Sequence, residues 1–170
     1  MDGTIRAYAA NGNLLWTYNF AQGAVLFASE PVVGDIDGDG TVVIVYGTYS
    51  PTGTANSLVG LNALHGNGLP VLGFPLLLPN ETAPKKSIRA APTIVDLDGD
   101  CKVEILAASL GGTVYAWDLP SPYYSDRISW PTGRHDNLRS GSFSGPLLFS
   151  SSCPEFVPKP NHVYLPVIWR

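Results

Sequence analysis

The chain has 170 residues with a formal net charge of −4 at pH 7, and its ten Lys and Arg residues form no basic stripe. Nucleic acid is therefore not an expected partner, and no apolar run approaches the roughly 20 residues that a membrane-spanning helix needs. The 18 Gly, 15 Pro and 45% hydrophobic residues, without a long apolar stretch at helical spacing, favour an all-β fold of short strands in one domain.

The N-terminal segment carries neither the basic nor the apolar region of a secretory signal, so we expect no signal peptide in this chain. Residues 3–9 (Gly-Thr-Ile-Arg-Ala-Tyr-Ala) alternate as a half-buried strand does, and residues 14–16 (Leu-Leu-Trp) start an aromatic segment. We predict two adjacent strands within residues 2–20.

The next stretch, residues 29–78, contains an acidic loop at 35–40 with the sequence Asp-Ile-Asp-Gly-Asp-Gly. An apolar run follows at 42–46, and further strands are predicted at 57–63 and around 73–75. Three carboxylates at alternate positions repel one another unless a cation lies between them. A hard cation with oxygen ligands, usually Ca²⁺, supplies that charge.

The same order of features returns in residues 90–140. A second acidic loop at 96–101 reads Asp-Leu-Asp-Gly-Asp-Cys, and an apolar run follows at 103–106. A Gly-Thr-Val-Tyr-Ala-Trp-Asp strand comes at 112–118, and Ser-Trp-Pro closes the copy at 129–131. The chain therefore contains an internal repeat.

Units of four short strands, interrupted by loops at 49–56 and 76–87, are typical of β-propeller blades with four antiparallel strands. We predict an incomplete propeller of about two and a half blades in residues 1–141. The partial blade covers 2–20 and the full blades cover 29–78 and 90–140. Because such an array leaves exposed edges, either a longer chain or other chains supply the remaining blades, or the domain is a compact two-sheet sandwich.

Residues 142–170 form an irregular, Ser- and Pro-rich tail that ends in an apolar strand at 162–170. That strand either packs on its own domain as an edge strand or is added to the sheet of a neighbouring subunit. Cys101 and Cys153 are either a disulfide that ties the second acidic loop to the tail or two free thiols.

Taken together, the pattern Pro-x-x-x-Asp-x-Asp-Gly-Asp-Gly, the apolar strand after it and the Gly-Thr-Val-Tyr-Ala strand resemble the FG-GAP (VCBS-like) repeat family over residues 2–141. Residues 130–136 and 139–141 resemble the segment that often closes the last blade in such proteins. The resemblance implies integrin-α-type calcium blades in an exported protein, located extracellularly or on the cell surface. Residues 2–16 and 112–118 also resemble the quinoprotein-type propeller repeat, but no cofactor signature accompanies them.

Neither loop is an EF-hand, because position 12 holds Tyr46 or Ala107 where that motif needs Glu. The FG-GAP resemblance places the last side-chain ligand at position 9, which is Glu104 in the second loop but Val43 in the first. Water would complete the first site. The expected calcium ligands are Asp35, Asp37, Asp39 and the Thr41 carbonyl, and Asp96, Asp98, Asp100, the Lys102 carbonyl and Glu104.

The function that we expect is a non-catalytic, calcium-binding scaffold or adhesion module. One alternative is a self-assembling subunit of an extracellular polymer, with blades completed between chains as a homo-oligomer. Another is an accessory carbohydrate-binding domain of a secreted enzyme, for which Tyr123, Tyr124 and Trp117 could form a glycan platform, although core packing is their commoner use.

No nucleophile, base and orienting group are assembled in the sequence, so we do not expect an enzyme. The three histidines are far apart, and His135 and the adjacent Asp136 are expected to point to opposite faces of a strand. Residues 80–82 (Asn-Glu-Thr) fit a glycosylation sequon in a loop.

Overall fold

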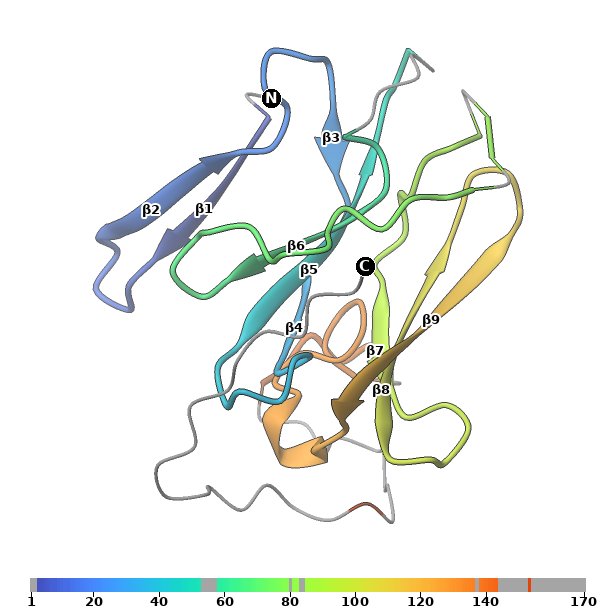
Figure 1. The fold of residues 1–170 in the computed structure, drawn as a ribbon. Helices are drawn as coiled ribbons and strands as arrows, with labels where there is room; N and C mark the ends of the chain where they lie inside the picture. Colours follow the sequence, from blue (N-terminus) through green and yellow to red (C-terminus); the bar gives the residue numbers. More distant parts are fainter. Residues whose placement is uncertain are drawn as a thin grey trace.

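The computed structural model describes residues 3–52, 58–79, 81–82, 85–136, 138–143 and 153. These residues form three antiparallel sheets and one short 3₁₀ helix, with no α-helix among them, so the expected all-β class is confirmed. The sheets follow one another in chain order across the molecule (Figure 1). The elements are β1 (Thr4–Tyr8), β2 (Leu14–Asn19), β3 (Phe27–Ala28), β4 (Val32–Gly34), β5 (Val43–Tyr49), β6 (Leu61–His65), β7 (Thr93–Val95), β8 (Lys102–Ala108), β9 (Val114–Pro122) and η1 (Ser125–Arg127).

The first sheet is the hairpin of β1 and β2, where the sequence pattern predicted two strands. Its alternating residues place Ile5, Trp16 and Tyr18 on one face, against a buried cluster that includes residues of β5 and β6. The indole Nε1 of Trp16 also donates a hydrogen bond to the Gly66 carbonyl, at 2.9 Å. The hairpin is therefore fixed to the middle sheet by both packing and a polar contact.

The middle sheet is centred on β5, which pairs with β3 and β4 along one edge and with β6 along the other. Beyond β6, bridges from Leu61 to Leu76 and from Leu64 to Pro70 add the expected fourth segment. This unit thus has the order first strand, second strand, third strand and closing segment that the repeat predicted.

The third sheet contains β7, β8 and β9, but its closing segment is not where the repeat predicted it. Trp130 exchanges two backbone hydrogen bonds with Val33 of β4, at 2.8 and 2.9 Å, and Thr132 pairs with Thr93 of β7. The prediction of an outer aromatic strand is wrong here. Within residues 129–132, Trp130 pairs with β4 of the middle sheet and Thr132 pairs with β7 of the third sheet. Among the described residues, no strand lies beside the outer edge of β9.

Both faces of the middle sheet are covered, because side chains of β5 alternate between two buried clusters. Val43 and Val45 face the third sheet and pack with Ile94, Val103 and Ile105, among others. Ile44 and Tyr46 belong to the other cluster, on the side of the hairpin. A Cβ on Gly47 would lie 2.2 Å from a side-chain atom of Ile88, so this strand position has no room for a side chain. The three sheets are therefore packed face to face in the order of the chain.

Candidate metal centre

The two acidic loops lie at the same end of the molecule (Figure 1). The first connects β4 to β5 and the second connects β7 to β8. Pro122 at the end of β9 pairs with Lys102 beside the second loop, and a Cβ on Gly38 of the first loop would lie 3.1 Å from the Pro122 ring. Both loops need left-handed backbone, as at Gly38 (φ 75°) and Gly99 (φ 82°), which glycine adopts readily.

In the first loop, Asp35 organises the turn through its side chain. Its Oδ1 accepts a hydrogen bond from Gly38 N (2.8 Å) and its Oδ2 accepts one from Gly40 N (2.9 Å). Asp39 Oδ1 accepts from both the backbone N and the hydroxyl of Thr41, at 2.7 and 2.6 Å. The position of the Thr41 carbonyl relative to a cation stays a prediction.

The carboxylates of Asp35, Asp37 and Asp39 each offer an oxygen within 4.8 Å of the others. Desolvation within the loop, together with the negative charges of Asp39 and Asp35, raises the pKa of Asp37 to about 6. Val43, at position 9, is fully buried in the core between the middle and third sheets. The structure therefore brings together three of the expected ligands, and desolvation is the largest cause of the raised pKa of Asp37, ahead of the neighbouring charges.

The second loop repeats the turn and adds a fourth carboxylate. Asp96 Oδ1 accepts from Gly99 N at 2.9 Å, and Asp98 Oδ1 accepts from Asp100 N at 3.1 Å. Asp96, Asp98, Asp100 and Glu104 each offer an oxygen within 4.8 Å of the others. The structure thus brings together all four side-chain ligands that the sequence predicted for this loop.

Glu104 is the most informative member of this cluster, because only 5% of its surface is exposed. Its Oε2 accepts a hydrogen bond from Leu97 N, whereas its Oε1 is buried and has no hydrogen-bond partner among the described residues. Desolvation, with smaller contributions from Asp98, Asp96 and Asp100, raises the pKa of Glu104. A buried carboxylate oxygen beside three other carboxylates is costly unless a cation compensates it.

Lys102 is the one cationic side chain that pairs with this loop in the described residues. Its Nζ forms an ion pair with Asp100 Oδ2, and its backbone N donates to Asp100 Oδ1 at 2.9 Å. The side-chain hydrogen bond from Lys102 lowers the pKa of Asp100, and the same contact raises the pKa of Lys102. Whether the Lys102 carbonyl ligates a cation stays a prediction.

The two cysteines form a disulfide, which decides between the alternatives that the sequence left open. Cys101 has φ 63° at the loop position where the first loop has Gly40 with φ 86°. The Sγ of Cys153 lies 3.0 Å from Asp96 Oδ2, so the disulfide touches the first carboxylate of the loop. The sequence contains no signal for this contact, since it depends on where residue 153 lies in space.

His135 and Asp136 lie in a turn after Thr132, so the expectation that they point to opposite faces of a strand is wrong. The turn has φ 78° at His135, and His135 Nδ1 lies 3.6 Å from Asp136 Oδ2. Ser140 donates to Asp136 through both its backbone N (3.0 Å) and its hydroxyl, which lowers the pKa of Asp136. Because Ser140 contacts the carboxylate and not the imidazole, this is not a nucleophile–base–acid order.

The other candidate residues that the structure describes take part in core packing or in hydrogen bonds within the fold. Tyr123 is buried in the core, and Trp117 stacks on Tyr115 with ring centroids 5.5 Å apart while packing against the same core. Glu81 of the sequon accepts a hydrogen bond from the Ser109 hydroxyl at 2.6 Å. Asn80 of the sequon, His162 and the predicted strand at 162–170 lie outside the described residues.

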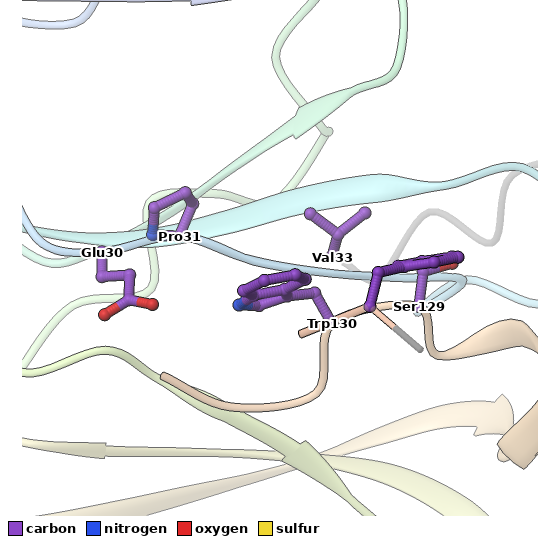
Figure 2. A pocket seen from close by; sticks show the side chains of 6 residues that line it. Glu30, Pro31, Val33, Ser129 and Trp130 are labelled. Atoms are coloured by element: carbon purple, nitrogen blue, oxygen red, sulfur yellow. The ribbon is translucent and has the colours of Figure 1, made fainter. Parts of the chain in front are cut away.

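An open apolar groove of about 390 Å³ lies between the segment that enters β4 and residues 129–143. Figure 2 shows the Trp130 ring beneath Val33, with the Glu30 carboxylate at one end. Glu30 Oε1 accepts a hydrogen bond from Arg134 N at 2.7 Å. No acid and base converge on this groove among the described residues; its lining is Glu30, Pro31, Val33, Ser129, Trp130 and Phe143.

No family model, curated protein or solved structure matches the chain. In the described part of the chain, no helix has the length and apolar character to cross a bilayer. The acidic loops are the most chemically specific arrangement in the described residues, and the second loop is the more complete of the two.

Proposed function

We propose that this chain is a non-catalytic, calcium-binding module of an exported protein, acting as a scaffold or adhesion element. The observation that carries the proposal is the buried, unpartnered Oε1 of Glu104 beside the carboxylates of Asp96, Asp98 and Asp100. Four carboxylate side chains around one loop fit Ca²⁺ better than Mg²⁺, which demands near-octahedral geometry and gives up its water reluctantly.

The cation has a structural role in this proposal. Asp96 follows the end of β7 and Glu104 lies within β8, so one ion bound by both would join two paired strands. Binding to the folded state alone stabilises it by mass action, by about 2.7 kcal/mol at a free calcium concentration 100 times the Kd. The first loop would act in the same way between β4 and β5, with three carboxylates and water.

The disulfide bears on the cellular location of the protein. Disulfides form and persist in oxidising compartments and are rare in the cytosol. The bond between Cys101 and Cys153 therefore supports an extracellular or cell-surface site of action. The resemblance to FG-GAP blades, which rests on the sequence, points in the same direction.

A second candidate function, assembly with further sheets, is favoured by a comparison of equivalent positions. In the middle sheet, Leu61 lies opposite Gly47 and is fully buried in the core cluster that the middle and third sheets share. In the third sheet, the equivalent residue Val114 lies opposite Ala108 and is 67% exposed. The outer face of the third sheet therefore exposes a valine at the position where the middle sheet has a buried leucine.

The opposite end of the stack shows the complementary feature. Tyr8 of β1 is 59% exposed, whereas Trp117, its equivalent in the repeat, packs against the core. We propose that both ends are covered by further propeller-type blades, contributed by a longer chain or by other copies of this one. Light scattering over a range of concentrations tests the second source, because a chain that stays monomeric at every concentration excludes self-assembly.

The calcium proposal is tested by thermal unfolding and titration calorimetry on metal-free protein. We expect Ca²⁺ to raise the Tm, excess EDTA to reverse the change, and Mg²⁺ at equal concentration to have a smaller effect. An identical unfolding curve in excess EDTA and in millimolar Ca²⁺ would contradict the proposed function.

A further inference from the structure

We propose that the Cys101–Cys153 disulfide and Ca²⁺ bound at the second loop are thermodynamically coupled, so that each stabilises the other. The disulfide raises the calcium affinity of this loop, and bound Ca²⁺ makes the disulfide harder to reduce. The inference rests on the proposed function, because it assumes that the second loop binds Ca²⁺. It adds a regulation that the first loop lacks.

Cys101 adopts an unfavourable backbone conformation. Its φ of 63° lies in the left-handed region, which disfavours residues with a Cβ, and the equivalent residue of the first loop is a glycine. Without a constraint, we expect a cysteine here to leave the left-handed conformation, because its Cβ makes that conformation unfavourable. That movement would displace both neighbours, the carboxylate of Asp100 and the carbonyl of Lys102, which are two of the expected ligands.

The disulfide joins the loop to Cys153. The Cα atoms of Cys101 and Cys153 are 5.4 Å apart, so the tail residue is fixed against the middle of the loop. The Cys153 Sγ is also 3.0 Å from Asp96 Oδ2, at the start of the loop. The disulfide is therefore covalently attached at the left-handed backbone position and also contacts the first expected ligand.

A third contact fixes the far side of the same residue. The Cys101 carbonyl accepts a hydrogen bond from Tyr123 N at 2.8 Å, just after β9. The loop is thus held to the tail by the disulfide and to the third sheet by the backbone. Loss of the disulfide removes the first of these attachments, and the number of loop conformations that must be given up on calcium binding increases.

The redox step is an ordinary thiol–disulfide exchange with a dithiol reductant. A thiolate of the reductant attacks one sulfur of the disulfide and forms a mixed disulfide, which its second thiolate resolves. Two electrons and two protons pass to the protein, giving the thiols of Cys101 and Cys153, and the reductant becomes a cyclic disulfide. Because coupling between two equilibria is reciprocal, the factor by which reduction weakens calcium binding equals the factor by which Ca²⁺ resists reduction.

The experiment isolates the second loop by removing the first. In an Asp37→Asn/Asp39→Asn variant, titration calorimetry measures the Kd for Ca²⁺ before and after reduction with dithiothreitol. We expect a Kd about tenfold higher after reduction. The matched control is an Asp98→Asn/Asp100→Asn variant, which retains only the first loop; its Kd should be the same in both redox states.

A second measurement keeps the test valid even if the reduced protein does not fold well. The dithiothreitol concentration that reduces half of the disulfide is determined with Ca²⁺ and with EDTA, by thiol labelling. We expect the reduction equilibrium to shift toward the disulfide in Ca²⁺ by the same tenfold factor. A Cys101→Gly/Cys153→Ser variant should bind Ca²⁺ more tightly than Cys101→Ser/Cys153→Ser, because glycine restores the left-handed conformation without a link.

The failures are distinguishable. Equal Kd values in the two redox states, with an unchanged reduction equilibrium, overturn the coupling and leave calcium binding intact. Absence of calcium binding to the oxidised second loop overturns the proposed function at that loop. A loss of affinity of equal size in the first-loop control shows general destabilisation and also overturns the coupling.

Discussion

The two acidic loops share one backbone frame and differ in how their charges are compensated. In both, the first aspartate accepts a hydrogen bond from the glycine three residues later, at 2.8 and 2.9 Å. In the first loop, desolvation and the neighbouring carboxylates together raise the pKa of Asp37. In the second loop an ion pair, a disulfide and a buried glutamate are added to the same turn.

Three substitutions account for this difference: Gly40 corresponds to Cys101, Thr41 to Lys102 and Val43 to Glu104. The last is the most consequential because position 9 lies within a strand. In the middle sheet it belongs to the core against the third sheet, and Val43 fills it. In the third sheet the same position holds a buried carboxylate beside the loop. A strand position can therefore serve packing or metal binding, depending on one residue.

Val43→Glu should have the largest effect, because it introduces the missing carboxylate at a fully buried site. Without a cation, we expect the folded state to lose about 3–5 kcal/mol, as an uncompensated buried charge does. Ca²⁺ should restore part of this loss, since the first loop then has the same four carboxylates as the second. Urea denaturation with Ca²⁺ and with EDTA measures both quantities.

The matched control for this variant is Val43→Gln, which introduces a polar side chain of similar size without charge. It should be destabilised as well, but Ca²⁺ should rescue it no more than the parent chain. Equal rescue of the Glu and Gln variants would show that position 43 cannot reach the cation, and that the two loops differ in geometry as well as in sequence.

Glu104→Gln tests the second loop from the opposite direction. The amide oxygen can still accept the hydrogen bond from Leu97 N, so the shape of the site is kept while the site loses one negative charge. Because calcium affinity depends strongly on the number of charged ligands, we expect the Kd to rise on the order of 100-fold. The unfolding free energy in EDTA should not fall, because removal of the charge also removes its repulsion by the aspartates.

The comparison variant is Glu81→Gln, a glutamate outside both loops that accepts a hydrogen bond from Ser109. Calorimetry should give it the parent affinity. A Glu104→Gln protein with parent affinity would remove Glu104 from the ligand set and make the two loops equivalent in their side-chain ligands.

Much of this architecture can be predicted from the sequence, because it depends on residues that are close together in the chain. Alternation at residues 3–9 and apolar runs at 42–46 and 103–106 predicted the strands that became β1, β5 and β8, and the spacing of aspartates and glycines predicted two similar turns. The spacing of Asp96, Asp98 and Asp100 predicted their cluster, and the resemblance to FG-GAP loops added Glu104 to it.

The features that the sequence did not predict depend on contacts between distant segments. Trp130 follows the aromatic pattern of an outer strand, yet it hydrogen-bonds with Val33, nearly 100 positions earlier. The burial of Glu104 and the proximity of Cys153 to Asp96 also follow from packing. The expectation that His135 and Asp136 lie on a strand is wrong, because the backbone of His135 is left-handed and lies in a turn.

Lys102→Thr should have the smallest effect, and it changes the second loop at the remaining position of difference. In the second loop the ammonium of Lys102 is paired with the carboxylate of Asp100. A cation that binds this carboxylate must share it with the ammonium or displace the ammonium. The pair is substantially exposed, so solvent screens it and we expect the Kd for Ca²⁺ to fall only a few-fold. The gain should shrink at high ionic strength, because salt screens the removed charge.

Thr41→Lys in the first loop is the reciprocal variant and should weaken binding there. If neither variant changes affinity at low salt, the lysine does not compete with the cation, and the glutamate and the disulfide are left to explain any difference in affinity between the loops.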